Sequence, residues 1–160
     1  MLSITMLAVG KLKEPFYLAA AEEYAKRLQG FCRFTLTELP EHRLPDTPSP
    51  AQIADGLARE AEALRARIPK NAWLCVLTPE GRLLSSEALA DKLVSVQNAG
   101  KSALCFVLGS SFGLAPALKR EADLCLSFSP MTFPHHLARV MLLEQLYRAQ
   151  SIQAGTKYHK

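Results

Sequence analysis

Apolar residues follow two spacings along the chain, one typical of strands and one typical of helices. Alternating or continuous apolar runs occupy residues 2–9, 31–39, 72–77, 103–108 and 124–128. Between these runs, apolar residues recur every three or four positions in the segments 17–28, 53–68, 89–96, 115–121 and 134–152. Strand and helix patterns that alternate in this way predict an α/β fold, with a mostly parallel sheet flanked by helices. We expect one domain over residues 1–160.

The polar positions between the apolar ones predict turns and solvent-facing surfaces. Four prolines between residues 40 and 50 predict an irregular surface loop. The run Thr78-Pro79-Glu80-Gly81 predicts a loop after the third strand, and Ser85 or Ser86 is suited to cap the helix that follows. The charged residues of the 53–68 helix are predicted to form a solvated face, and they are Asp55, Arg59, Glu60, Glu62 and Arg65.

Two strand ends near the carboxyl terminus are candidates for ligand binding. The run 104–108 stops at Gly109, with a second glycine at Gly113, and the run 124–128 continues into Ser129 and Pro130. Strands that stop at glycine or proline leave main-chain groups unpaired, and this edge of an α/β sheet is where ligands bind. The glycine spacing does not fit a dinucleotide-binding motif. Taken alone, the loop favours a plain turn over a ligand site.

The last helix, 134–152, is apolar nearly all round its surface. Its apolar members are Leu137, Val140, Met141, Leu142, Leu143, Leu146, Tyr147, Ala149 and Ile152. A helix of this kind is buried on more than one side. We therefore predict a homodimer, in which one side of the helix faces the sheet and another faces a second subunit. The alternative is a central core helix within one subunit.

Net charge and composition indicate which kinds of molecule the protein could bind. With 49% apolar and 21% charged residues, the composition fits one globular domain. The net charge of +4 suggests a polyanionic partner such as nucleic acid, although many ordinary enzymes have a similar charge. From Pro134 onward there are four Lys or Arg residues against one Glu, with Tyr158 and three histidines among them. Such groups can hold phosphates and stack on bases, although a solvated tail has the same composition.

Cysteine usage and apolar run lengths bear on metal, disulfide and membrane chemistry. The four cysteines are predicted to be small buried apolar residues rather than metal ligands or disulfides, and they are Cys32, Cys75, Cys105 and Cys125. No apolar run is long enough to span a bilayer, and no secretory leader precedes the first strand. We therefore expect a cytoplasmic protein with no metal site.

Several short motifs are spread along the chain. They are residues 8–11 (AVGK), 106–109 (FVLG) with Gly113 and Leu114, 126–129 (LSFS), 131–135 (MTFPH), 139–140 (RV), 144–149 (EQLYRA) and the terminal pair Tyr158 and His159. Together they resemble the ribosomal RNA large subunit methyltransferase H family, small bacterial members of the SPOUT class, and the resemblance covers essentially the whole chain. Two positions depart from the family's usual pattern, since Ser110 stands where a second glycine is usual and Thr78 where an acidic residue is common.

The resemblance implies a C-terminal deep trefoil knot whose loops bind S-adenosyl-methionine, with a homodimer as the active form. By position, the cofactor contacts are Leu77, Gly109, Phe128, Ser129, Pro130, Met131, Thr132 and Phe133. Tyr158 and His159 of one subunit are expected to reach the other subunit's cofactor site as catalytic residues. His135, Arg148 and Lys160 are expected near the RNA.

The implied reaction is methylation of ring nitrogen 3 of a pseudouridine in 23S rRNA of the large ribosomal subunit. Because this imide nitrogen must lose its proton before it attacks the methyl group, a nearby base or cation should speed the transfer. Two alternatives are a non-catalytic module of the same fold that binds RNA or the ribosome, and a flavodoxin-like small-molecule enzyme with an unknotted sheet.

Overall fold

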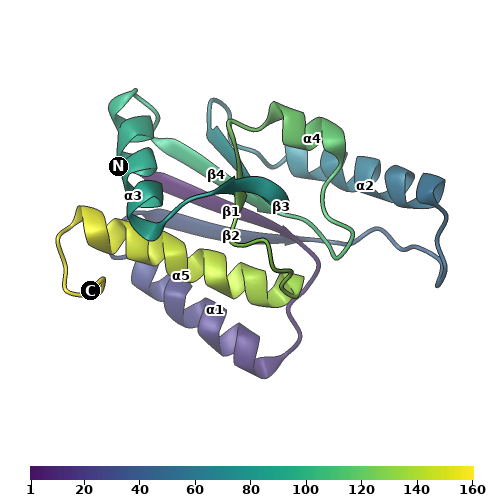
Figure 1. Ribbon diagram of the computed structural model, residues 1–160, viewed down its shortest axis with the longest axis horizontal. Helices are drawn as coiled ribbons and strands as arrows, with labels where there is room; N and C mark the ends of the chain where they lie inside the picture. Colours follow the sequence, from purple (N-terminus) through teal and green to yellow (C-terminus); the bar gives the residue numbers. More distant parts are fainter.

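A parallel sheet with the strand order β2-β1-β4-β3-β5 forms the centre of the computed structural model, which describes all 160 residues (Figure 1). The strands are β1 (Ser3–Val9), β2 (Arg33–Leu39), β3 (Trp73–Leu83), β4 (Ala103–Leu108) and β5 (Leu124–Ser127). Every pairing between neighbouring strands is parallel. The predicted α/β class is therefore confirmed.

The five helices cover the sheet in two layers, one on each face. They are α1 (Pro15–Leu28), α2 (Pro50–Arg65), α3 (Ser86–Asn98), α4 (Pro116–Glu121) and α5 (His135–Gln153). Helices α1, α3 and α5 pack together on one face, and α2 and α4 cover the other (Figure 1). The alternation of strands and helices in the sequence thus produces a three-layer structure.

Each central strand sends its side chains to two separate cores. In β1, Ile4 and Met6 pack against the layer of α1, α3 and α5, whereas Leu7 and Val9 pack against the layer of α2 and α4. Successive side chains of a strand point to opposite faces, so the part of a strand that is covered on both sides is apolar at successive positions. This burial explains the continuous apolar runs over residues 6–9 of β1, 73–77 of β3 and 103–108 of β4.

Helix starts follow the predicted local signals. Ser49 caps α2 in a capping box with Gln52, and Ser85 caps α3 by accepting a hydrogen bond from the amide of Ala88 at 3.0 Å. Proline occupies the start of α1, α2 and α4, where its missing N–H removes no helical bond. Of the two serines proposed as the cap of α3, Ser85 is the one used.

The third strand is longer than its local sequence indicates. The loop predicted over residues 78–81 is wrong, because β3 continues to Leu83 and pairs with β5 a second time, through Arg82 and Leu83. A Cβ on Gly81 would lie 2.7 Å from the carbonyl carbon of Leu126. The main chain of β3 therefore crosses so close to β5 that glycine is required there.

The remaining structural predictions have mixed outcomes. All four cysteines are free, with three buried and Cys125 half-buried, as expected of small apolar residues. No helix is both long and apolar enough to cross a bilayer. The trefoil knot implied by the resemblance stays a prediction.

Candidate functional site

Three segments line a cavity of about 660 Å³ at the carboxyl ends of β4 and β5 and beside the middle of β3. They are residues 77–80, 108–113 and 127–135 except Pro130, with Lys119 and Ala138 completing the lining. Ligands of parallel α/β sheets bind at this end of the strands, and small-molecule pockets span about 300–1,000 Å³. The cavity lies where the sequence predicts unpaired main chain.

One wall is a tight turn between β4 and α4, which we call the glycine loop (residues 109–113). The amide of Gly113 donates to the carbonyl of Ser110 at 2.9 Å, and Gly113 has a φ of 88°, a conformation that favours glycine. A Cβ on Gly109 would overlap the carbonyl oxygen of Gly113 and lie 2.6 Å from its carbonyl carbon. The loop thus needs glycine at both ends.

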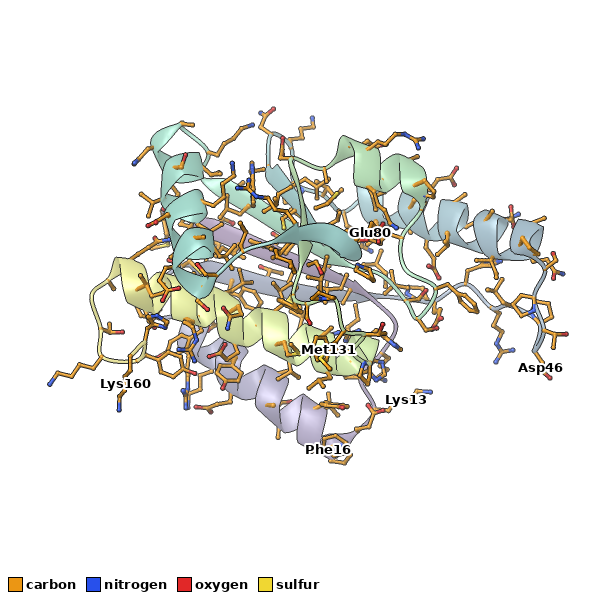
Figure 2. All side chains as sticks on the ribbon, in the orientation of Figure 1. Lys13, Phe16, Asp46, Glu80, Met131 and Lys160 are labelled. Atoms are coloured by element: carbon orange, nitrogen blue, oxygen red, sulfur yellow. The ribbon has the colours of Figure 1, made fainter.

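The opposite wall is the irregular segment 128–134, which joins β5 to α5. Ser127 Oγ donates to the carbonyl of Ser129 at 3.2 Å, and the amide of Met131 donates to Ser129 Oγ at 3.0 Å. Serine side chains that bond to nearby main chain hold such a turn without regular secondary structure. The Met131 side chain projects into solvent at the rim and is 74% exposed (Figure 2).

Polar side chains from β3, α4 and α5 line the cavity. Thr78 belongs to the cavity lining, and its Oγ1 is buried without a hydrogen-bond partner. Lys119 Nζ lies 2.6 Å from Glu80 Oε1, and this hydrogen bond is the largest of several causes that lower the pKa of Glu80 to about 2. Burial, together with His136, lowers the pKa of His135, so its ring is neutral at pH 7. The cavity therefore offers an unpaired hydroxyl, an ionised carboxylate and a neutral imidazole.

The structure brings seven of the eight predicted cofactor residues to this cavity. Leu77, Gly109, Phe128, Ser129, Met131, Thr132 and Phe133 line it, and Pro130 does not. Their contact with a cofactor stays a prediction. Sequence reasoning missed Thr78, Glu80 and Lys119, because residues 78–81 were assigned to an ordinary loop and Lys119 lies in a different element. The predicted RNA residue His135 also lines the cavity.

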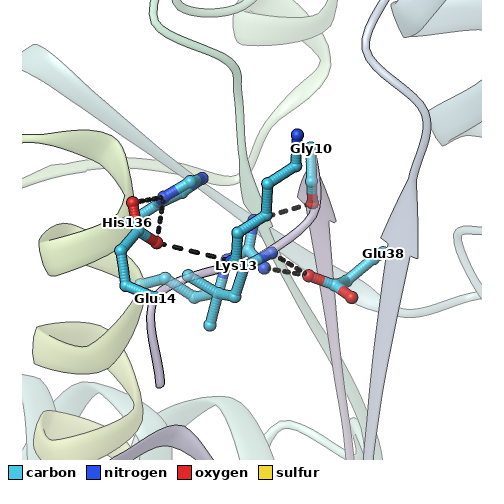
Figure 3. A network of polar contacts seen from close by, with 7 residues as sticks. Gly10, Lys13, Glu14, Glu38 and His136 are labelled. Carbon is cyan, nitrogen blue, oxygen red and sulfur yellow. Dashed lines mark hydrogen bonds and ion pairs between the residues drawn. The ribbon is translucent and has the colours of Figure 1, made fainter. Parts of the chain in front are cut away.

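A buried arginine, Arg139, joins the first turns of α5 to Gly10 and Glu38, which are labelled in Figure 3. Arg139 is 1% exposed, and its guanidinium donates to Glu38 Oε2 at 2.5 Å and to the carbonyl of Gly10 at 3.0 Å. Glu38 Oε2 also accepts a hydrogen bond from the amide of Leu12 at 2.8 Å. These contacts join α5 to the carboxyl ends of β1 and β2. Because α5 begins where segment 128–134 ends, the same contacts fix that wall of the cavity.

A second contact joins α5 to α1 at the same end. Nδ1 of His136 lies 3.1 Å from Oε2 of Glu14 (Figure 3). Glu14 directly precedes the first residue of α1. The ring of Tyr17 lies edge-on to His136, with centroids 6.4 Å apart. The amino-terminal turn of α5 is therefore held from the sheet and from α1.

The C-terminal tail lies near the other end of α5. Tyr158 donates to Glu144 Oε1 at 3.0 Å, and His159 Nε2 lies 2.7 Å from Glu87 Oε1. Arg148 Nη1 lies 3.1 Å from His159 Nδ1. Because arginine can only donate, Nδ1 accepts this bond, and the ring proton on Nε2 is donated to Glu87. Arg148 also lies over the Tyr158 ring, 4.8 Å from its centroid.

Within one chain, the tail and the glycine-loop cavity lie at different points along α5. Arg148, which contacts the tail, follows His135 by 13 helical positions, or about 20 Å along the axis, and Glu144, which bonds to Tyr158, follows Ala138 of the cavity lining by six, or about 9 Å. The structure therefore does not bring Tyr158 and His159 to the cavity of their own chain. Lys160 is exposed at the chain end (Figure 2). No group of three His, Cys, Asp or Glu residues is arranged to hold a metal ion.

Comparison of the sequence with known proteins gives full-length matches. A family model described as predicted SPOUT methyltransferase matches residues 2–159. The chain is 45% identical over 160 residues to the ribosomal RNA large subunit methyltransferase H of Moorella thermoacetica, and both proteins are covered completely. It is 42% identical over 159 residues to the protein of the same name from Bifidobacterium adolescentis, covering 99% of this chain and 100% of that one.

Solved structures of more distant sequence share the fold. A putative methylase family protein from Neisseria gonorrhoeae superposes with a TM-score of 0.54 at 15% identity, covering 98% of this chain and 95% of that chain. A putative methyltransferase from Legionella pneumophila, solved in complex with bound S-adenosyl-methionine, superposes with a TM-score of 0.52 at 12% identity. That match covers 92% of this chain and 66% of the Legionella chain.

Proposed function

The chain belongs to the SPOUT methyltransferase family, and from this premise we propose that it transfers a methyl group from S-adenosyl-methionine to ring nitrogen 3 of a pseudouridine in 23S rRNA. The observation that carries the proposal is the cavity between the glycine loop and segment 128–134. Family membership excludes the flavodoxin-like small-molecule enzyme considered from the sequence.

The residues at the cavity fit the proposed cofactor. Its volume is about 660 Å³, within the range of small-molecule sites, and apolar side chains such as Leu77 and Phe128 alternate with polar groups along its lining. The unpaired Thr78 hydroxyl and the ionised Glu80 carboxylate can accept hydrogen bonds from a ligand's hydroxyl or amino groups. When bound, S-adenosyl-methionine supplies the electrophilic methyl group. The glycine loop and segment 128–134 would hold it between two main-chain walls.

The proposed RNA substrate is supported by charge and by the names of the relatives. The chain carries a net charge of +4, and the close relatives are large-subunit rRNA methyltransferases. His135 at the cavity and Arg148 and Lys160 near the tail are the proposed RNA contacts. Arginine and lysine suit phosphates, and a neutral histidine can stack on a base or share a hydrogen bond with it.

The distance between tail and cavity supports a homodimer as the active form. No residue of the tail lines the cavity of its own chain, so a tail that acts in catalysis would do so at the cavity of another chain. Helix α5 is also incompletely covered within one chain, since Leu137, Val140 and Met141 are only half-buried. We propose that a second copy covers this surface and that each tail serves its partner's cavity.

The tail must change partners before it can act in this way. Both ring nitrogens of His159 are engaged within the chain, by Arg148 and by Glu87. Release from Glu87 and Arg148 would free Nδ1 to accept the imide proton of the target base, and Arg148 could stabilise the negative charge that develops there. Tyr158 would keep the tail aligned.

Methyl transfer to RNA tests the proposed function. The purified protein is incubated with labelled S-adenosyl-methionine and with ribosomes or large subunits that lack the modification. We expect the label in 23S rRNA at N3 of a pseudouridine. RNA binding without any methyl incorporation would instead support the non-catalytic module.

Replacing His159 with alanine is expected to lower kcat for methyl transfer by about 30-fold, because a proton acceptor is lost while both reactants stay aligned. The affinity for S-adenosyl-methionine, measured by calorimetry, should change by less than about twofold. Lys157→Ala, which alters an exposed residue of the same tail, is the control. Equal losses of kcat and cofactor affinity in His159→Ala would argue against a tail that acts on the substrate.

A further inference from the structure

A buried carboxylate lies directly behind the glycine loop. Glu60 of α2 is 8% exposed, so its assignment to the solvated face of this helix is wrong, whereas its neighbour Glu62 is exposed as predicted. No lysine or arginine pairs with Glu60. Its hydrogen-bond partners are the main-chain amide of His42 at 2.8 Å and the hydroxyl of Ser110 at 3.5 Å. Burial raises the pKa of Glu60.

The two oxygens of Glu60 connect segments that are far apart in sequence. Oε1 accepts from Ser110, which lines the proposed cofactor cavity, and Oε2 accepts from His42 in the proline-rich segment 40–48. That segment packs tightly on α2 one turn earlier, where a Cβ on Gly56 would lie 3.1 Å from the His42 ring. Glu60 therefore joins the glycine loop, α2 and the proline-rich segment at one point.

Ser110 is the buried member of an otherwise open loop tip. It is 6% exposed, while the next two residues, Ser111 and Phe112, are exposed. The internal bond from Gly113 to Ser110 sets the shape of the turn but does not attach the tip to the rest of the protein. The hydroxyl of Ser110, through Glu60, supplies that attachment.

Burying the Glu60 carboxylate costs desolvation free energy, so we expect it to make contacts that an apolar side chain could not make. Removing an unpaired carboxylate from water is strongly unfavourable, and an apolar side chain of similar size would pack there without that cost. Only an acceptor can satisfy both the amide of His42 and the hydroxyl of Ser110. The arrangement therefore favours a positioning role over simple packing.

We propose that Glu60 is a positioning residue for the methyl-transfer reaction. By accepting hydrogen bonds from Ser110 and His42, it holds the glycine loop in the shape that leaves the cavity open to the cofactor. The same carboxylate also holds the proline-rich segment 40–48 through His42. Loosening this segment should therefore weaken cofactor binding, and cofactor binding should make the segment more ordered. This inference rests on the proposed function, because it assigns the cavity to the cofactor.

Four variants measured by calorimetry with S-adenosyl-methionine test the role of Glu60. Glu60→Ala removes both hydrogen bonds and is expected to weaken cofactor affinity about tenfold. Glu60→Gln keeps an acceptor for His42 and a group that can bond to Ser110, so its affinity should stay within about twofold of wild type. Ser110→Ala removes one bond and should lose about threefold. The double variant Glu60→Ala/Ser110→Ala should bind no more weakly than Glu60→Ala, because both changes break the same link.

Glu62→Ala, which alters an exposed residue two positions after Glu60 on the same helix, is the matched control and should bind like wild type. Amide hydrogen exchange without cofactor gives a second readout, in which Glu60→Ala should speed exchange in residues 40–48 and 109–113 and Glu62→Ala should not. Wild-type affinity in Glu60→Ala, or additive losses in the double variant, would overturn the inference. A wild-type protein that binds no S-adenosyl-methionine would instead overturn the proposed function.

Discussion

Replacing Gly109 with alanine is expected to weaken binding of S-adenosyl-methionine by about 100-fold or more, and methyl transfer should fall with it. The added Cβ would overlap the carbonyl oxygen of Gly113 and lie 2.6 Å from the carbonyl carbon. Both atoms belong to main chain in the wall of the cavity, so the clash cannot be relieved by rotating a side chain. The loop has to move, and the cavity changes shape with it.

Calorimetry on folded protein measures this loss, and circular dichroism at the same temperature confirms that the variant is folded. Gly30→Ala is the matched control, because the same methyl group would there lie 3.3 Å from the nearest atom, in a turn far from the cavity. The control should bind the cofactor like wild type. Normal cofactor affinity in Gly109→Ala would show that the glycine loop is not part of the binding site.

Replacing Arg139 with alanine is expected to lower the free energy of unfolding by about 3 kcal/mol, at the lower end of the cost of breaking a buried ion pair, because the Glu38 side chain left unpaired is 34% exposed. The guanidinium is 1% exposed and satisfies both the Glu38 carboxylate and the Gly10 carbonyl. Without it, these acceptors and the space of a large side chain are left unfilled. Since a domain has about 5–15 kcal/mol of stability in total, the variant should be close to unfolding.

Urea denaturation followed by circular dichroism measures this change. Arg59→Ala is the control, because Arg59 pairs with Asp55 on the surface of α2, where both side chains are about 60% exposed. An exposed pair of this kind contributes less than about 1 kcal/mol. Similar losses in the two variants would mean that the Arg139 network does not hold the start of α5.

The element types and the position of the cavity could be predicted from the sequence because both depend on local patterns. Continuous apolar runs mark strands covered on both faces, and glycine or proline at their ends marks main chain left without partners. The extension of β3 to Leu83 could not be predicted in this way. Pro79 and Gly81 indicate a loop locally, and the pairing of Arg82 with Leu126 involves a strand more than 40 residues later.

The roles of the two buried charged residues, Arg139 and Glu60, could not be predicted from local sequence either. Arg139 interrupts an apolar helix, which is a signal that a partner exists, but its partner Glu38 lies 101 positions earlier in the chain. Glu60 lies next to the apolar face of α2 within a run of charged residues, and its helical position alone gave no reason to separate it from Glu62. Only the approach of Ser110 and His42 distinguishes the two.

The placement of the tail depends on a second chain, which no single-chain pattern specifies. The resemblance implied that Tyr158 and His159 act at a partner's cofactor site. In one chain they instead contact Glu144, Glu87 and Arg148, away from the cavity. The departures at Ser110 and Thr78 both fall on the cavity lining, where the serine has a buried partner and the threonine hydroxyl has none.

A crystal structure of the protein grown with S-adenosyl-methionine tests the central claim most directly. We predict density for the cofactor between residues 109–113 and 128–134, with residues 158–159 of a second subunit beside it. Cofactor bound at another place, or side chains of the protein itself filling the space between these two walls, would contradict the account.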